Sequence, residues 1–154
     1  MAGGTVSSRL LVFDDELLRR GQSGAIWGRI YFDIDGEPFP DRGWSDLVVP
    51  IADAWLEALL KMTSGTMARA KVHFMDGPFY VTIALAAPGI ASLSFVHRGV
   101  IKRSLTSSLD VLLQDAIASG EQLLRICGEH DWSDDSDCSH LAANLQRAIK
   151  SLPA

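Results

Sequence analysis

The chain has 154 residues and a mass of 16.7 kDa, with 47% apolar residues, 21% charged residues and a mean hydropathy of +0.14. These values are typical of a single globular domain over residues 1–154 and exclude a disordered chain. Nineteen acidic residues against fourteen basic ones give a formal charge of −5 and a pI near 5.2. An acidic surface repels phosphate groups, so nucleic acid is not expected as a partner.

The apolar runs and the cysteines indicate in which cellular compartment the protein is expected. The longest strongly apolar runs, such as Val81 to Ala87, are far shorter than the roughly 20 residues that cross a bilayer. The first residues lack the long apolar region of a secretory signal. Two cysteines, Cys127 and Cys138, are too few for a secreted disulfide framework. We therefore expect no membrane span and a cytoplasmic protein.

Two strands are predicted at the start of the chain. Ile26 to Asp35 alternates apolar and polar side chains, which is typical of a half-buried strand. Leu10 to Phe13 predicts a shorter strand before it. Gly21 to Gly24 is expected to connect the two, because glycine and serine favour turns.

A long helix is predicted from Trp44 to Met62, where apolar residues recur at helical spacing. Ser45 is a candidate N-cap. Pro50 disfavours helix in the residue before it, so the helix either begins near Val49 or is kinked there.

Three strands should follow, from Ala70 to Met75, Phe79 to Ala86 and Ile90 to Arg98, with Val100 to Leu105 as an extension. Asp-Gly-Pro and Pro-Gly sequences separate them and favour turns, so the strands should pair as an antiparallel meander. One face of this sheet should be apolar. It is formed by Val72, Phe74, Phe79, Val81, Ile83, Leu85, Leu93 and Phe95.

Two helices end the predicted fold. Residues Ser107 to Cys127 place their apolar side chains on one helical stripe, capped by Ser107 or Ser108, and a last helix runs from about Ser136 to Leu152. The last helix should bury Leu141, Leu145 and Ile149. The sequence therefore predicts an α+β fold in the order ββ-α-βββ-αα, with an antiparallel sheet of about five strands and helices packed on one face.

A first acidic group follows the predicted strand Ile26 to Asp35. Asp33, Asp35 and Glu37 occupy every second position, so their carboxylates could converge on a hard cation. The spacing is not that of an EF-hand, because Trp44 stands where the loop would need its last glutamate. A solvated turn that includes Asp41 is the alternative.

A second acidic group lies between the last two helices. It consists of Glu129, Asp131, Asp134, Asp135 and Asp137, and it also fails the EF-hand pattern. Its later aspartates are suited to cap the final helix. Trp132 lies among these residues and is a candidate anchor for a partner, although it could also pack on its own helices.

Cysteine and histidine residues offer a third cluster. Cys127, His130, Cys138 and His140 are ligand types that zinc prefers, within fourteen residues of sequence. The short loop and the Cys-x-His spacing argue against chelation, and Cys127 falls on the buried stripe of its helix. His73 and His97 lie on neighbouring predicted strands, where structural histidines are commoner than catalytic ones.

A stretch in the middle of the chain resembles a group of small bacterial proteins. The segment GRIYFDIDGEPFPDRGWSDLVVPIADAWLEALLKM and the run VHFMDGPFYVTI carry the likeness, over about Gly28 to Ile83. Its residues are Phe39, Pro40, Trp44, Asp46, Trp55, Leu56, Asp76, Gly77 and Pro78. The chain departs from the expected pattern at Pro50 and Ala54. This group is similar to immunity proteins of polymorphic toxin systems, which implies a protein that binds and neutralises a cognate toxin.

These observations favour a binding protein over an enzyme, without a cofactor or metal. The predicted partner is a cognate toxin or another basic protein, because acidic patches speed association with a basic surface. The candidate contacts are Asp35, Glu37, Asp41, Asp131, Trp132, Asp134, Asp135 and Asp137. A small metal-dependent hydrolase or a zinc-binding domain is the alternative. A third hypothesis is a structural or regulatory subunit that pairs with itself, as a homodimer, or with another chain through the polar sheet face of Lys71, His73, Tyr80, Thr82 and Ser94.

Overall fold

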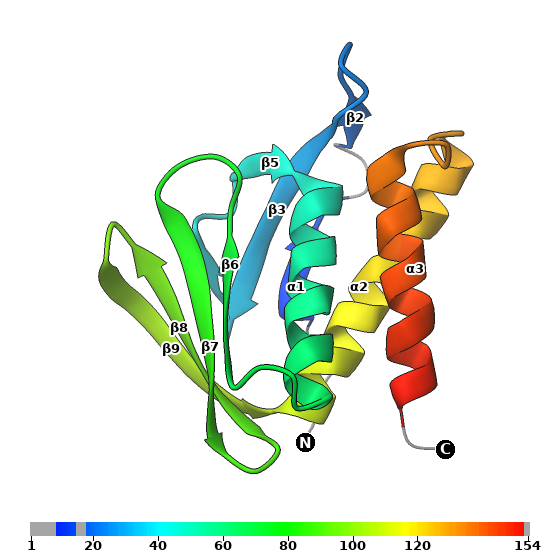
Figure 1. Cartoon of the computed structure of the whole chain (residues 1–154). Coiled ribbons are helices and arrows are strands. Elements are labelled where there is room, and N and C mark those ends of the chain that lie inside the picture. Colours follow the sequence, from blue (N-terminus) through cyan, green and yellow to red (C-terminus); the bar gives the residue numbers. More distant parts are fainter. Residues whose placement is uncertain (1–8, 15–17, 153–154) are drawn as a thin grey trace.

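The computed structural model describes residues 9–14 and 18–152 and confirms the α+β class (Figure 1). The long elements follow the predicted order. The strands form two antiparallel sheets, one of five strands in which four short strands pair with β3 and one of four strands. The elements are β1 (Leu11–Phe13), β2 (Arg19–Arg20), β3 (Ile26–Ile34), β4 (Glu37–Phe39), β5 (Ser45–Leu47), α1 (Val48–Thr63), β6 (Arg69–His73), β7 (Phe79–Ala87), β8 (Ile90–His97), β9 (Val100–Ser108), α2 (Leu109–Glu129) and α3 (Ser136–Ser151).

The second sheet is the predicted meander, in the order β6-β7-β8-β9. Val81 pairs with Val72 on one side and Phe95 on the other, so the apolar residues of three strands share a face. This face is buried at all three positions. Leu85 was expected on it but is 40% exposed, because it lies beside the register shift near the end of β7.

The first sheet is organised around β3, which pairs with β1, β2, β4 and β5. The Gly21 to Gly24 segment is the turn of the β2–β3 hairpin, and Gly24 adopts a positive φ of 90° there. The β3 residue Phe32 contacts the rings of Trp55 on α1 and Phe95 on β8 at centroid distances of 5.1 and 5.4 Å. β3 therefore contributes Phe32 to a core that it shares with α1 and the inner face of the β6–β9 sheet.

Helix α1 begins at Val48, close to the start that Pro50 indicated, and Pro50 lies in its first turn. A proline is tolerated there because the first N–H groups of a helix have no intrahelical partner. Ser45 was expected to be the N-cap, and this prediction is wrong. The N-cap is Leu47, and Ser45 instead pairs with Arg29 in the first sheet.

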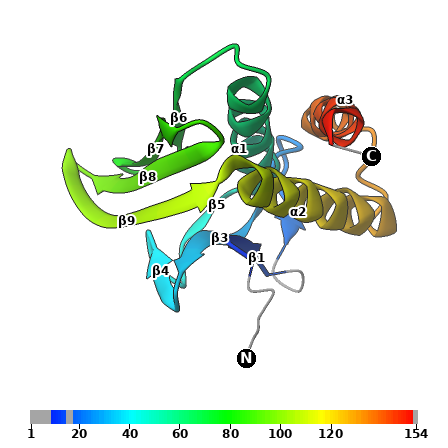
Figure 2. The same ribbon diagram turned by 90° about the horizontal axis from the view of Figure 1, so that it is seen from below.

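Helices α2 and α3 pack with α1 on one side of the β6–β9 sheet (Figure 2). Ser108 is the N-cap of α2, and its Oγ accepts a hydrogen bond of 3.2 Å from the Val111 N–H. Helix α3 buries Leu141 and Leu145 as predicted. Ile149 was expected to be buried but is 45% exposed, because the turn of α3 near its end presents Ala148 to the core instead.

Four of the residues that carry the resemblance, Trp44, Asp46, Asp76 and Gly77, lie in one structural cluster. Asp46 is fully buried, and its carboxylate accepts hydrogen bonds from Trp44 Nε1 at 3.0 Å and from the backbone N–H of Asp76 at 3.1 Å. The Trp44 ring lies against Gly77, where a Cβ would come within 2.9 Å of it. These residues join β5 to the β6–β7 turn, which is a structural role.

Candidate functional site

The second acidic group forms a corner of the molecule, where the chain turns from α2 into α3. Asp131, Asp134, Asp135 and Asp137 define this acidic corner. Asp131 adopts a positive φ of 64°, which reverses the chain after α2. Asp131, Asp134 and Asp137 are exposed, whereas Asp135 is partly buried. Four carboxylates therefore lie between the end of α2 and the first turn of α3, at one end of the helical layer.

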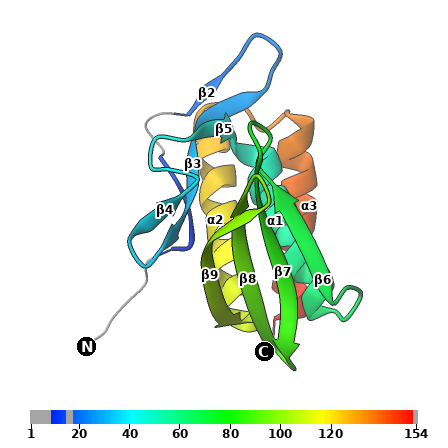
Figure 3. The ribbon, with the colours of Figure 1, turned by 90° about the vertical axis from the view of Figure 1, so that its left-hand side faces the viewer.

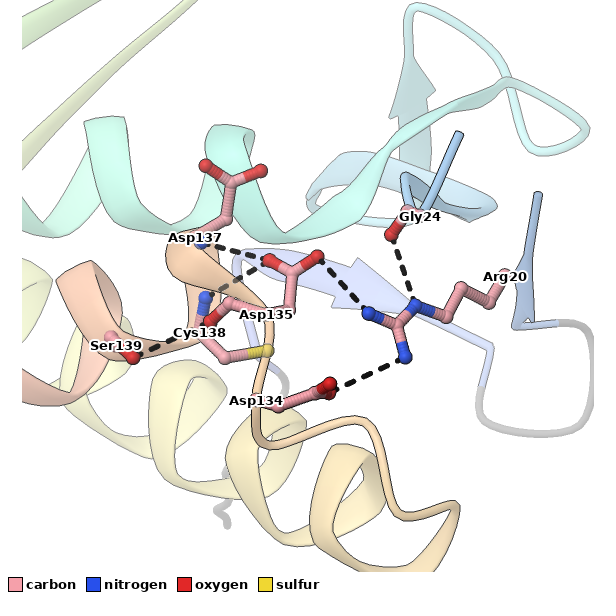
Figure 4. A network of polar contacts seen from close by, with 7 residues as sticks. All are labelled: Arg20, Gly24, Asp134, Asp135, Asp137, Cys138 and Ser139. Atoms are coloured by element: carbon pink, nitrogen blue, oxygen red, sulfur yellow. Dashed lines mark hydrogen bonds and ion pairs between the residues drawn. The ribbon is translucent and has the colours of Figure 1, made fainter. Parts of the chain in front are cut away.

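One cation lies against this corner. Arg20, from the β2–β3 hairpin, places Nη1 3.4 Å from Asp134 Oδ1 and Nη2 4.0 Å from Asp135 Oδ2 (Figure 4). Its Nε donates to the carbonyl of Gly24 at 3.2 Å, which holds the guanidinium in place. This contact could not be predicted from the sequence, since Arg20 and Asp134 are 114 residues apart. Arg20 therefore balances part of the negative charge.

Asp135 has a second, structural role. It is the N-cap of α3, and its Oδ1 accepts hydrogen bonds from the backbone N–H groups of Asp137 at 2.8 Å and Cys138 at 3.3 Å. The predicted capping of the last helix by an aspartate of this loop is thus confirmed. Asp137 lies in the first turn of α3, where the helix dipole favours a carboxylate.

Trp132 packs on its own protein. It is partly buried against the hydrophobic core, and its ring stacks on His130 with centroids 4.4 Å apart. Its backbone N–H donates to the carbonyl of Cys127 at 2.7 Å. Trp132 is therefore held rigidly beside the acidic corner, and only part of its ring surface can meet a partner.

The first acidic group occupies the β3–β4 turn. Asp33 Oδ1 accepts a hydrogen bond of 2.8 Å from the Gly36 N–H, and Asp35 adopts a positive φ of 53°. Glu37 forms an ion pair with Arg103 of β9 at 3.2 Å. Asp41 Oδ1 accepts from the Gly43 N–H at 2.6 Å. Asp33 and Asp41 therefore stabilise turns, and Glu37 links the two sheets.

The two acidic groups do not form a single surface. Arg20 pairs with Ile26 at the start of β3 and carries the contact to the acidic corner, whereas Glu37 pairs with Ile34 at the end of β3. β3 has nine residues, and a strand rises about 3.3 Å per residue, so its ends lie about 26 Å apart. A compact partner surface would contact one group or the other.

The cysteine and histidine residues are only partly brought together. Cys127 and Cys138 are both buried and free, and a hydrogen bond between their thiols, together with burial, raises the pKa of Cys138. His130 instead stacks on Trp132, and His140 Nδ1 lies 3.8 Å from Asp53 Oδ2. Among residues 9–14 and 18–152, no three His, Cys, Asp or Glu side chains are arranged to hold a metal ion.

His73 and His97 lie on opposite sides of β7. His73 contacts Tyr80 with ring centroids 5.4 Å apart, whereas His97 stacks on the neighbouring residue Phe79 at 4.3 Å. Successive side chains of a strand point to opposite faces. The two imidazoles therefore do not face each other as an acid and base pair.

A polar contact between α1 and α3 was not predicted from the sequence. Asn144 is buried, and its Nδ2 donates to Asp53 Oδ1 at 2.7 Å, while Arg147 donates to Asn144 Oδ1. Burial raises the pKa of Asp53, although the bond from Asn144 opposes this shift. These side chains fix the position of α3 against α1, and α3 begins at the acidic corner.

No family model, curated protein or solved structure matches the chain significantly. None of the helices in the described part of the chain has the length and apolar character needed to span a membrane.

Proposed function

We propose that the chain is a stoichiometric binding protein of the immunity type, which neutralises a basic bacterial toxin by direct contact in the cytoplasm. The observation that carries this proposal is the acidic corner, where four aspartates lie together on the end of the helical layer. Arg20 reaches only Asp134 and Asp135 among them. Asp131 and Asp137 are exposed and available to the cations of a partner.

The rigidity of the corner supports the same proposal. Asp135 caps α3, and Trp132 packs on the core, so the backbone that carries the four aspartates is held in place before a partner binds. A preorganised surface loses less conformational entropy on binding. The free thiols of Cys127 and Cys138 support a reducing compartment such as the cytoplasm.

The proposal is tested with the product of the gene immediately upstream, produced as purified protein. Titration calorimetry should give a stoichiometry of one to one, with an affinity that falls as salt is raised. Replacing Asp131, Asp134 and Asp137 by lysine should weaken binding by about a hundredfold or more, since close charge pairs across an interface contribute strongly. Asp135 is left unchanged because it caps α3.

A matched variant replaces three carboxylates distant from the corner, Asp35, Glu37 and Asp110, by lysine. It changes the net charge equally and should bind almost as the natural chain does. An equal loss in both variants, or none in either, would remove the corner from the interface. Protection of the toxin's target at substoichiometric amounts would point to an enzyme instead.

A further inference from the structure

Charge is segregated along the chain. Between Thr66 and Leu109, which span the β6–β9 sheet, the only acidic residue is Asp76, against the basic residues Arg69, Lys71, Arg98, Lys102 and Arg103. The chain has 14 basic and 19 acidic residues, so nine basic and eighteen acidic residues lie elsewhere. The β6–β9 sheet is therefore a basic unit within an acidic protein.

One face of this sheet is turned away from the helices and toward the viewer in Figure 3. Its cross-strand rows are set by the register, in which Lys71 pairs with Thr82, Thr82 with Ser94 and Ser94 with Ser104. Arg69 precedes Lys71 by two residues and shares its face. We call this surface the outer sheet face and define it by Arg69, Lys71, Tyr80, Thr82, Ser94 and Ile101.

The two cations at the β6 edge of this face are uncompensated. Arg69 and Lys71 are exposed, and neither has an ion-pair partner among the described residues. By contrast, Lys61 and Arg125 on the helices each pair with a glutamate one turn away, at 3.8 and 3.4 Å. The outer sheet face therefore offers positive charge to a partner, whereas these two helical cations are already paired.

The remaining side chains suit contact with a polypeptide. Ile101 is 59% exposed and lies in the same row as Tyr80, because Val96 pairs with both. Serine and threonine hydroxyls between them can donate and accept hydrogen bonds. Lys71 Nζ lies 4.5 Å from the centre of the Tyr80 ring. Since the ammonium lies over this ring, Tyr80 is poorly placed to stack on a nucleic acid base, as aromatic side chains do in proteins that bind single strands.

We propose that the outer sheet face is a second interaction surface, which docks an acidic polypeptide through Arg69 and Lys71. Charge complementarity selects this occupant: the face carries cations and no carboxylate, in a chain that is otherwise acidic. This inference goes beyond the proposed function, because the acidic corner lies on the helical layer and would take a basic partner. The chain would then have two surfaces of opposite charge for two different contacts.

The test uses the full chain and fluorescently labelled poly-L-glutamate as the acidic probe, with binding followed by anisotropy at low ionic strength. The natural chain should bind, and the double variant Arg69→Glu with Lys71→Glu should bind roughly tenfold more weakly or worse. The matched control is Lys61→Glu with Arg125→Glu, which changes net charge equally on the helices and should bind within about twofold of the natural chain. Circular dichroism checks that each variant is folded, and Arg69→Gln with Lys71→Gln is used if the reversal does not fold.

Several results would overturn the proposal. One is absence of binding to poly-L-glutamate, and another is an equal loss in the two double variants, which would reflect net charge alone. Tighter binding of a single-stranded oligonucleotide would assign the face to nucleic acid. Self-association in light scattering that disappears in the Arg69 and Lys71 variant would assign it to a second copy of this chain.

Discussion

Asp46 and Asp76 are joined across thirty residues by a hydrogen bond of 3.1 Å from the Asp76 N–H to Asp46 Oδ2. The same oxygen accepts from Trp44 Nε1 at 3.0 Å, and Oδ1 accepts from the Leu47 N–H at 2.7 Å. Because the carboxylate is fully buried, these three donors replace the water that it loses on folding. Asp46 thereby fixes the β6–β7 turn to the start of α1.

Replacement of Asp46 by asparagine should destabilise the fold by roughly 2–4 kcal/mol. An amide has the same shape but turns an NH2 group toward donors, so at least one buried N–H is left without an acceptor. The free energy of unfolding in urea measures the effect. Asp76→Asn is the control, since Asp76 contributes only its backbone to this contact, and it should stay within about 0.5 kcal/mol. Equal losses in the two variants would contradict this account.

Asp135 should matter more to stability than Arg20. Asp135→Ala removes the N-cap of α3 and should cost about 1 kcal/mol. Arg20→Ala breaks ion pairs at the surface and should cost less than that, as exposed pairs contribute little. A double-mutant cycle on the free energies of unfolding gives the coupling between them.

The control for this cycle is Asp134→Ala, because the Asp134 side chain is 77% exposed and caps no helix. It should change stability by less than about 0.5 kcal/mol. If Arg20→Ala proved as costly as Asp135→Ala, the ion pair rather than the cap would hold the corner together.

The long elements could be predicted because their periodicity extends over many residues. Buried residues recur at helical spacing along the 21 residues of α2, and turn sequences separate the strands of the meander. Strands β2, β4 and β5 have only two or three residues, too few for any period to be read. Ile149 has the right spacing for the apolar stripe of α3, but near the end of the helix Ala148 is buried and Ile149 is exposed.

The candidate site was predictable as a set of residues, not as a geometry. The acidic residues between α2 and α3 lie close enough together in the sequence to be recognised as one group. Their contact with Arg20 depends on the β2–β3 hairpin reaching the far end of the helices, which only the packed structure determines. The separation of Glu37 from Asp134 by the length of β3 also follows from the topology alone.

Gly28 lies where β3 packs against Leu18 and the first residue of α1, Val48, and its replacement by alanine should destabilise the fold by about 1–3 kcal/mol. A Cβ at this position would overlap Leu18 Cδ2 and lie 3.1 Å from Val48 Cγ2. Gly43→Ala is the matched control, since its nearest contact is Asp41 Oδ1 at 3.4 Å, and it should have little effect. Thermal unfolding of both variants measures the difference. A neutral Gly28→Ala would mean that Leu18 can move aside at no cost.

Asp115 should make the stability depend on pH. Burial raises the pKa of its carboxyl, and the hydrogen bonds from the backbone N–H groups of Leu10 at 2.8 Å and Leu11 at 3.3 Å oppose this shift. A carboxyl whose pKa is higher in the folded state binds its proton more tightly there. Its contribution to stability is therefore complete below the unfolded pKa of about 3.9 and is lost as pH rises through the folded value.

Asp115→Asn removes this titration. Its amide oxygen can still accept the bond from Leu10, so the variant should fold, with a loss of about 1 kcal/mol at low pH for the bond to Leu11. As pH rises above about 4, the free energy of unfolding of the natural chain should fall relative to that of the variant, because only the natural chain must ionise a buried carboxyl. Urea unfolding at a series of pH values measures this difference. If the natural chain instead became more stable relative to the variant as pH rises, attraction by Arg9, which lowers the pKa of Asp115, would outweigh burial.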